Sequence, residues 1–257
     1  MIIFVHIPKT AGTSLIRNVL RKQITKNDRD FTVKKEFKHY LFGDKTFKEK
    51  PHVISGHFPF GVHKCFDVEH YSYFTFLRNP VQRWISHFLY SLEGSDNDII
   101  KNTYNSHDGD FLSFLDKCES LEIVCNIMTK QLSGLEHPNN LFLRKKHRVS
   151  GCYYVPSACS AKNKYDDDEM NHFLDVARSN LESCDFVGFQ ENYDKDVKRF
   201  CGIYGLEYPK ENVRYRKRNI VDTKFVKLFS KSDVLLKIQE INKYDMDLYD
   251  YAKNKYR

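Results

Sequence analysis

The sequence predicts an α/β fold: a doubly wound, mainly parallel sheet flanked by helices. Four short apolar runs rich in β-branched and aromatic residues are expected as strands, at about residues 2–7, 52–55, 73–77 and 186–189. Helical patterns separate these runs, and strands that alternate with helices are typical of parallel sheets. The chain has 257 residues, of which 41% are hydrophobic and 29% charged. We therefore expect a single domain over residues 1–257.

The first apolar run leads directly into a loop of small residues that holds one lysine. Residues 8–14 read Pro-Lys-Thr-Ala-Gly-Thr-Ser, and a helical pattern follows. The N–H groups at a helix start have no intrahelical partner, and the helix dipole adds partial positive charge, so this segment is suited to a phosphate. The loop is not a Walker A motif, because Lys9 precedes Gly12. Taken alone, the heptapeptide also fits an ordinary turn with a surface lysine.

The third apolar run ends at an arginine that stands before another helix. Asn79 is a good N-cap and Pro80 suits the first helical position. Side chains of this helix that recur at helical spacing are expected to face the core: Trp84, Ile85, Phe88, Leu89 and Leu92. The guanidinium of Arg78 and the hydroxyl of Ser86 can share the oxygens of one phosphate. A capped amphipathic helix with a structural arginine is the alternative.

A histidine follows the second apolar run, in the sequence Gly56-His57-Phe58-Pro59. Side chains at the carboxyl ends of strands in an open α/β sheet line the ligand crevice, so His57 is placed to meet a substrate. A structural histidine is the alternative. His6 and His63 are weaker candidates, because His6 is expected within a strand and His63 lies beyond the turn.

These three segments together resemble sulfotransferases that use 3′-phosphoadenosine 5′-phosphosulfate (PAPS). The resemblance is greatest to the carbohydrate branch, such as the heparan sulfate and uronyl 2-O-sulfotransferases. It is specific over residues 5–14, 55–61 and 76–86 and fainter over the rest of the chain. The family fold that it implies is the P-loop-kinase-like α/β sandwich.

The resemblance also implies a role for each motif residue. The PAPS-binding positions that it implies are Lys9, Thr10, Ala11, Gly12, Thr13, Ser14, Arg78, Ser86, Arg216 and Lys217. The last two stand in a basic stretch that fits a solvated loop equally well. His57 is implied as the general base for an acceptor hydroxyl, and Lys9 as the cation beside the departing phosphate. No metal is implied.

The formal net charge of +7 suits PAPS and a polyanionic carbohydrate acceptor. The same charge would suit nucleic acid, but no nucleic-acid recognition module is visible, so no such partner is expected. The densest basic cluster, residues 144–148, either flanks the acceptor or forms a solvated surface. We find no secretory signal and no apolar run long enough to span a membrane, so we expect a cytoplasmic protein.

Seven cysteines occur without a CxxC pair or zinc-like spacing, so we expect buried, reduced thiols. In an oxidising compartment, Cys118 could pair with Cys125, or Cys152 with Cys159.

The other elements are predicted from turn-forming residues and from the spacing of apolar residues. Residues 94–109 are expected as a loop and 134–165 as mostly loop. Helices are expected at about 110–118, at 120–133, after the acidic residues 166–169, at 193–204 and at 232–255. The acidic run fits a helix N-terminus better than a metal site.

Two other functions stay open at this point. One is a P-loop-like nucleotide-dependent kinase, against which the missing Walker A order and the Arg78–Ser86 motif argue. The other is a non-catalytic member that binds the desulfated nucleotide PAP or a sulfated glycan. The identity of the acceptor and the oligomeric state cannot be read from the sequence.

Overall fold

The computed structural model describes residues 1–23, 53–65, 68–94, 98–121, 124–134, 165–210 and 223–257. Its sheet has four parallel strands in the order β2-β1-β3-β4: β1 (Ile2–Val5), β2 (Val53–Gly56), β3 (Ser72–Leu77) and β4 (Phe186–Phe189). In the register of the sheet, Val5 lies opposite Gly56 on one side and Thr75 on the other. The predicted fold class and all four predicted strands are confirmed.

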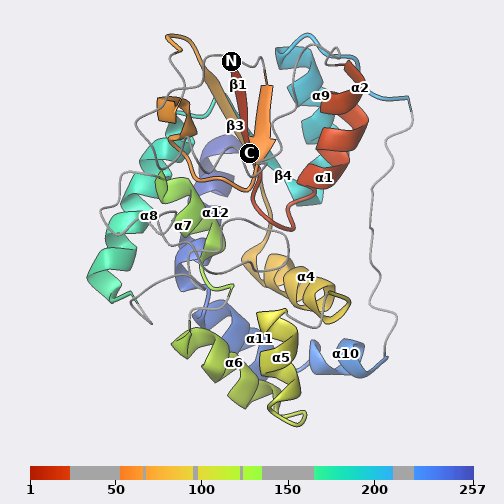
Figure 1. The fold of residues 1–257 in the computed structure, drawn as a ribbon, viewed down its shortest axis with the longest axis vertical. Helices are drawn as coiled ribbons and strands as arrows, with labels where there is room; N and C mark the ends of the chain where they lie inside the picture. The colour runs from red at the N-terminus through yellow and green to blue at the C-terminus, as the bar shows by residue number, and fades with distance from the viewer. Residues whose placement is uncertain (24–52, 66–67, 95–97, 122–123, 135–164, 211–222) are drawn as a thin grey trace.

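One face of the sheet is covered by the N-terminal helical segment and one late helix (Figure 1). These elements are α1 (Gly12–Leu15), the π-helical turn η1 (Ile16–Leu20), α2 (Arg21–Gln23) and α9 (Tyr193–Ile203). Apolar side chains of α1, η1 and α9 pack on Phe4 and Phe74, whose rings stack with centroids 4.6 Å apart.

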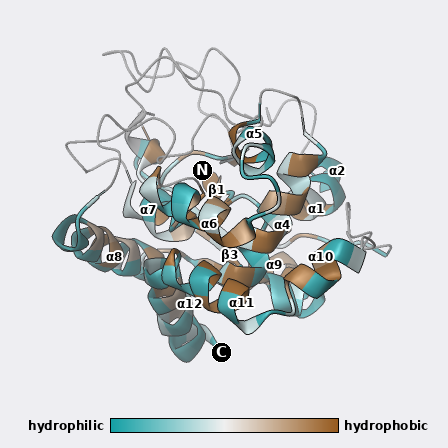
Figure 2. Cartoon of the chain, turned by 90° about the horizontal axis from the view of Figure 1, so that it is seen from below, coloured by the Kyte–Doolittle hydropathy of each residue, from teal (hydrophilic) through white to brown (hydrophobic). Residues whose placement is uncertain are grey.

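The opposite face carries the larger core, to which most other helices contribute. The remaining elements are η2 (Val62–Cys65), α4 (Pro80–Leu92), α5 (Ile99–Asn105), α6 (Phe111–Ser120), α7 (Ile127–Ser133), α8 (Asp167–Glu182), η6 (Gln190–Asn192), α10 (Thr223–Leu228), α11 (Ser232–Glu240) and α12 (Lys243–Tyr256). Figure 2 shows brown segments of α4 toward the middle, whereas teal stretches of α8 and α12 lie at the rim. Trp84, Ile85 and Phe88 of α4 are buried as predicted.

Two helix starts lie where they were predicted, one with the predicted Asn79 cap and one at the acidic run 166–169. The side chain of Asn79 accepts a hydrogen bond from the Gln82 N–H, with Pro80 at the first position of α4. Asp166 and Glu169 form a reciprocal capping box at the start of α8. The acidic run at residues 166–169 therefore forms the cap and the first turn of α8.

Three predicted segment boundaries are wrong, the first two because of a capping side chain and of two left-handed residues. The expected loop 94–109 contains α5, which begins where Asp98 Oδ1 accepts from the N–H groups of Ile100 and Lys101, at 2.9 and 3.4 Å. The expected helix 120–133 is reduced to α7. Val124 and Asn126 have φ values of 63° and 51°, a left-handed conformation that no α-helix can continue.

The expected last helix, 232–255, is two helices that meet at Asn242. This side chain is fully buried: Nδ2 donates to the Ile238 carbonyl at 2.9 Å, and Oδ1 accepts from the Asn126 N–H at 3.2 Å. Satisfying both bonds takes Asn242 out of helical geometry, with φ at −121°. A contact with a residue far away in the sequence therefore breaks the helix.

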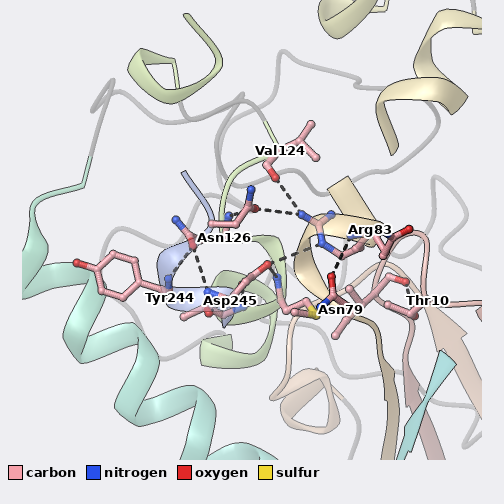
Figure 3. A network of polar contacts seen from close by, with 12 residues as sticks. Thr10, Asn79, Arg83, Val124, Asn126, Tyr244 and Asp245 are labelled. Carbon is pink, nitrogen blue, oxygen red and sulfur yellow. Dashed lines mark hydrogen bonds and ion pairs between the residues drawn. The ribbon is translucent and has the colours of Figure 1, made fainter. Parts of the chain in front are cut away.

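A buried polar network joins α4, α7 and α12 (Figure 3). Arg83 of α4 donates to the Val124 carbonyl at 3.1 Å, and its Nε lies 3.8 Å from a carboxylate oxygen of Asp245. Both side chains are fully buried. Burial lowers the pKa of Arg83, and the carboxylate of Asp245 opposes that shift. Asn126 Oδ1 accepts from the N–H of Tyr244 and of Asp245, at 3.1 and 3.2 Å.

Four cysteines whose side chains the structure describes are reduced. Cys118, Cys125, Cys184 and Cys201 are free and buried. Cys118 and Cys125 form no bridge; the Cys125 thiol donates to the Cys118 carbonyl instead, at 3.7 Å. The other pair considered, Cys152 and Cys159, lies outside the described residues. None of the described helices is both long and apolar enough to cross a membrane.

Candidate functional site

Several predicted site residues within the described part of the chain lie at one edge of the sheet. Because the strands are parallel, their carboxyl ends meet there, and β1, β2 and β3 are followed directly by His6, His57 and Arg78. The connection after β1 runs to α1 on one face, whereas the connection after β3 runs to α4 on the other. Connections that diverge in this way open a ligand site between the two strands.

The loop over residues 8–14 turns its backbone toward this edge. Lys9 and Ala11 have φ values of 72° and 70°, and the Thr10 hydroxyl donates to the Ile7 carbonyl at 2.9 Å. Alternation of left-handed residues with others points successive N–H groups into an anion-binding concavity. Helix α1 has no side-chain cap, so its first N–H groups, on Gly12 and Thr13, are available in the way expected for a phosphate.

Within this loop, Gly12 packs directly under the His6 ring. A Cβ on Gly12 would lie 2.1 Å from Cδ2 of His6, so only glycine fits there. His6 is itself buried, and its pKa is held well below the usual value, first by burial and then by electrostatic interactions with His57 and Lys9. The His6 ring is therefore neutral, and it packs against the loop at Gly12.

Arg78 ties the second motif to the first. Its Nη1 donates to the Lys9 carbonyl at 3.1 Å, while its buried Nε has no hydrogen-bond partner among the described residues. Burial lowers the pKa of Arg78, and the nearby Glu191 carboxylate opposes the shift. Ser86 lies half-buried two turns into α4, the helix that Arg78 precedes.

His57 lies beside His6 at the end of the neighbouring strand. The two ring centroids are 4.2 Å apart, and His57 Nδ1 lies 2.6 Å from the His6 carbonyl oxygen. A carbonyl only accepts, so Nδ1 carries the proton of the neutral ring and Nε2 carries the lone pair. This is the tautomer that a general base working through Nε2 requires.

The side chain of Lys9 reaches toward α4. Its Nζ lies 4.3 Å from the centroid of the Tyr90 ring, one turn beyond Ser86. His87, next to Ser86, is buried, and neither of its ring nitrogens has a hydrogen-bond partner among the described residues. Burial lowers the pKa of His87, and electrostatic interactions with Arg83, Lys9 and His57 lower it further. His87 therefore lies within electrostatic reach of both Lys9 and His57.

Sequence reasoning did not find Tyr90 or His87 as members of this site. Their positions in the sequence offered a signal, because His87 is next to Ser86 and Tyr90 follows one helical turn later in α4. Gln131 of α7 was also missed; its Nε2 donates to the carbonyls of His6 and Phe58, at 3.2 and 2.9 Å. No local pattern in the sequence marks that residue.

The structure places His63 elsewhere. Its Nδ1 lies 2.8 Å from the hydroxyl of Tyr73, near the amino end of β3, opposite the edge that holds His57. Arg216, Lys217 and the basic cluster 144–148 lie outside the described residues.

In a comparison with protein-family models, the model described as the sulfotransferase family aligns with residues 1–252, nearly the whole chain. The chain belongs to the sulfotransferase family. A comparison with curated proteins found no match for this sulfotransferase. Its α/β fold with a parallel sheet agrees with that of the family.

Two features of this sulfotransferase fit a ligand that carries phosphates. The first is the glycine-containing loop at the start of α1, where backbone N–H groups lack a side-chain cap. The second is the buried Arg78 Nε, a charged donor without a partner in the described structure. Both features lie at the carboxyl edge of the sheet and are joined by the bond from Arg78 to Lys9.

Proposed function

We propose that this sulfotransferase moves the sulfuryl group of PAPS to a hydroxyl of a carbohydrate acceptor. The observation that carries the proposal is the hydrogen bond from Arg78 to the Lys9 carbonyl, at 3.1 Å. It joins the two predicted phosphate-binding segments at the edge where His57 lies. One ligand with phosphates at two positions would bridge these segments, and PAPS is such a ligand.

Each segment has a distinct role in holding the nucleotide. The N–H groups of Gly12 and Thr13, with the hydroxyls of Thr13 and Ser14, would surround the 5′-phosphate. Arg78 would direct its partnerless Nε toward the 3′-phosphate, with the Ser86 hydroxyl as a second donor. Lys9, Thr10 and Ala11 complete the loop. Arg216 and Lys217, outside the described residues, remain proposed contacts by resemblance to the family.

When bound, PAPS would supply an activated sulfuryl group. The protein would accept the proton of the acceptor hydroxyl and stabilise the charge on the departing phosphate oxygen. His57 Nε2 would take the proton of the acceptor hydroxyl as the new oxygen–sulfur bond forms, a contribution of about 10²–10⁴-fold in rate. The bond between sulfur and the 5′-phosphate oxygen breaks in the same step. The Lys9 ammonium would stabilise the charge that develops on this oxygen.

A carbohydrate acceptor is supported by the resemblance of the Gly56-His57 turn to that of the carbohydrate branch. The formal charge of +7 also suits a polyanionic oligo- or polysaccharide.

The nucleotide assignment can be tested by thermal unfolding with PAP, ADP and ATP at equal concentrations. A ligand at one hundred times its dissociation constant adds about 2.7 kcal/mol to the free energy of unfolding. We expect a large rise of the unfolding midpoint with PAP and little with ADP or ATP, because only PAP carries a 3′-phosphate. A shift with ATP alone would favour the kinase alternative, and no shift with any nucleotide would contradict the proposal.

The catalytic assignment is tested in the same preparation with His57→Ala. This variant should bind PAP nearly as the wild type does, yet transfer sulfuryl groups from labelled PAPS to a panel of glycans about 10²–10⁴-fold more slowly. Arg78→Ala should instead weaken PAP binding much more than ADP binding. If His57→Ala lost nucleotide binding and activity together, His57 would be structural.

A further inference from the structure

Helix α7 brings the buried side-chain amide of Gln131 to two backbone carbonyls near His57, one in the neighbouring strand segment and one in the next residue. Gln131 is 1% exposed, and its Nε2 donates to the carbonyl oxygen of His6 at 3.2 Å and to that of Phe58 at 2.9 Å. The His6 oxygen is the same atom that His57 Nδ1 contacts at 2.6 Å. We infer that Gln131 is a positioning residue for His57. This inference rests on the proposed function, in which His57 is the general base.

The hydrogen-bonding capacities of these groups match. An amide nitrogen has two hydrogens, and Gln131 has a carbonyl acceptor for each. A carbonyl oxygen has two lone pairs, and that of His6 faces two donors, Gln131 and His57. Gln131 thereby fixes the oxygen that sets the tautomer of His57. It also fixes the carbonyl of Phe58, the residue after His57, so the ring is held through its Nδ1 and the chain is held one residue beyond it.

Helix α7 is suited to this role because it is anchored at both ends. At its start, Asp245 accepts from the N–H groups of Met128 and Thr129, at 3.1 and 2.8 Å. At its end, Asn180 of α8 donates to the Leu132 carbonyl at 2.8 Å. All seven residues of α7 are buried.

The backbone of α7 contacts the His57 segment as well. The Phe60 N–H donates to the Gln131 carbonyl at 3.0 Å, so the main chain and the side chain of Gln131 both hold residues 58–60. The same Asp245 pairs with Arg83 of α4, the helix of the proposed 3′-phosphate motif (Figure 3). One connected network of buried contacts thus fixes the positions of both α4 and the proposed base, His57.

The first test compares Gln131→Met with Ser133→Ala in full-length protein. Methionine fills a similar volume but cannot donate, whereas Ser133→Ala removes another buried side-chain bond of α7, from Ser133 Oγ to the Lys130 carbonyl. We expect Gln131→Met to lower kcat by about 10²-fold, since a small displacement of a reacting group has an effect of that size. PAP affinity should be unchanged, and Ser133→Ala should keep wild-type kcat. A loss of PAP affinity in proportion to kcat would overturn the inference.

A double-mutant cycle separates positioning from a general loss of structure. If Gln131 acts through His57, Gln131→Met should cause no further loss of the residual rate in the His57→Ala background. Equal losses in both backgrounds would overturn the inference.

A third variant, Gln131→Glu, is nearly isosteric and donates only when its carboxyl group is protonated. Its kcat relative to wild type should therefore fall as pH rises. A ratio that is independent of pH would contradict the role of the donated bonds.

The last readout needs no enzymatic turnover. In ¹⁵N-histidine-labelled wild type, His57 should be in the Nδ1–H tautomer, and Gln131→Met should raise the fraction of the other tautomer. A wild-type His57 in the Nε2–H form would overturn the inference even if no variant folds. If the tautomer shifts as expected but PAP does not bind, the proposed function fails while the contact of Gln131 stands.

Discussion

At the scale of single residues, Gly12 shows how a small residue sets the geometry of the site. The loop needs a backbone that approaches the His6 ring, and a Cβ at position 12 would meet that ring at 2.1 to 2.8 Å. The ring itself is confined, because His6 is buried and lies 4.2 Å from His57. A side chain at position 12 would therefore displace both the phosphate loop and the base.

We expect Gly12→Ala to lower the free energy of unfolding by about 1–3 kcal/mol and to abolish the midpoint shift with PAP. Gly202→Ala is the matched control, because this glycine lies within α9 and a Cβ there meets nothing within 4 Å. That control should be neutral or more stable by up to about 1 kcal/mol. Denaturant unfolding and PAP titration measure both; equal behaviour of the two variants would refute the steric argument.

At the scale of elements, α7 depends on helices distant in sequence. Asp245 of α12 supplies the acceptors for its first N–H groups, and Asn126, just before α7, supplies the acceptor for those of α12. Each helix thus caps the other. This reciprocity explains why a carboxylate, an arginine and two asparagines are buried together in the core.

Removing Asp245 leaves the Arg83 guanidinium buried without its counter-ion. We expect Asp245→Ala to lower the free energy of unfolding by about 3–5 kcal/mol. Lys243→Gln is the control, because Lys243 pairs with Asp167 at 2.9 Å on the surface, where a pair contributes at most about 1 kcal/mol. Urea unfolding compares the two variants. A similar small loss in both would mean that the buried network contributes little.

At the scale of the whole molecule, two neutral histidines link stability to pH. The pKa values of His6 and His87 lie well below 6.5 in the folded protein, chiefly through burial. In the unfolded chain both rings take up protons near pH 6.5. Below that pH the unfolded state binds more protons, so stability is present above pH 6.5 and is lost as the pH falls toward the folded-state pKa values.

We expect the free energy of unfolding to fall below pH 6.5, by at most about 1.4 kcal/mol per pH unit for each histidine. His87→Leu should reduce that slope. At pH 7.5 it should be no less stable than wild type, because neither ring nitrogen of His87 has a partner among the described residues. Urea unfolding from pH 5 to 8 measures the slopes; an unchanged slope in His87→Leu would exclude His87 as a cause.

The sequence by itself determined the features that depend on neighbours along the chain. Strand periodicity, the Asn79 cap, the acidic helix start at residues 166–169 and the family motifs at residues 8–14, 57 and 78–86 are local, so the α/β fold and the candidate site were predicted. The tertiary structure alone decided the break at Asn242, the pairing of Arg83 with Asp245, and the contact of Gln131 with the His57 segment. In each case the partners are more than seventy residues apart. Such pairs leave no periodic or spacing signal, because only folding creates the buried environment that makes their polar contacts necessary.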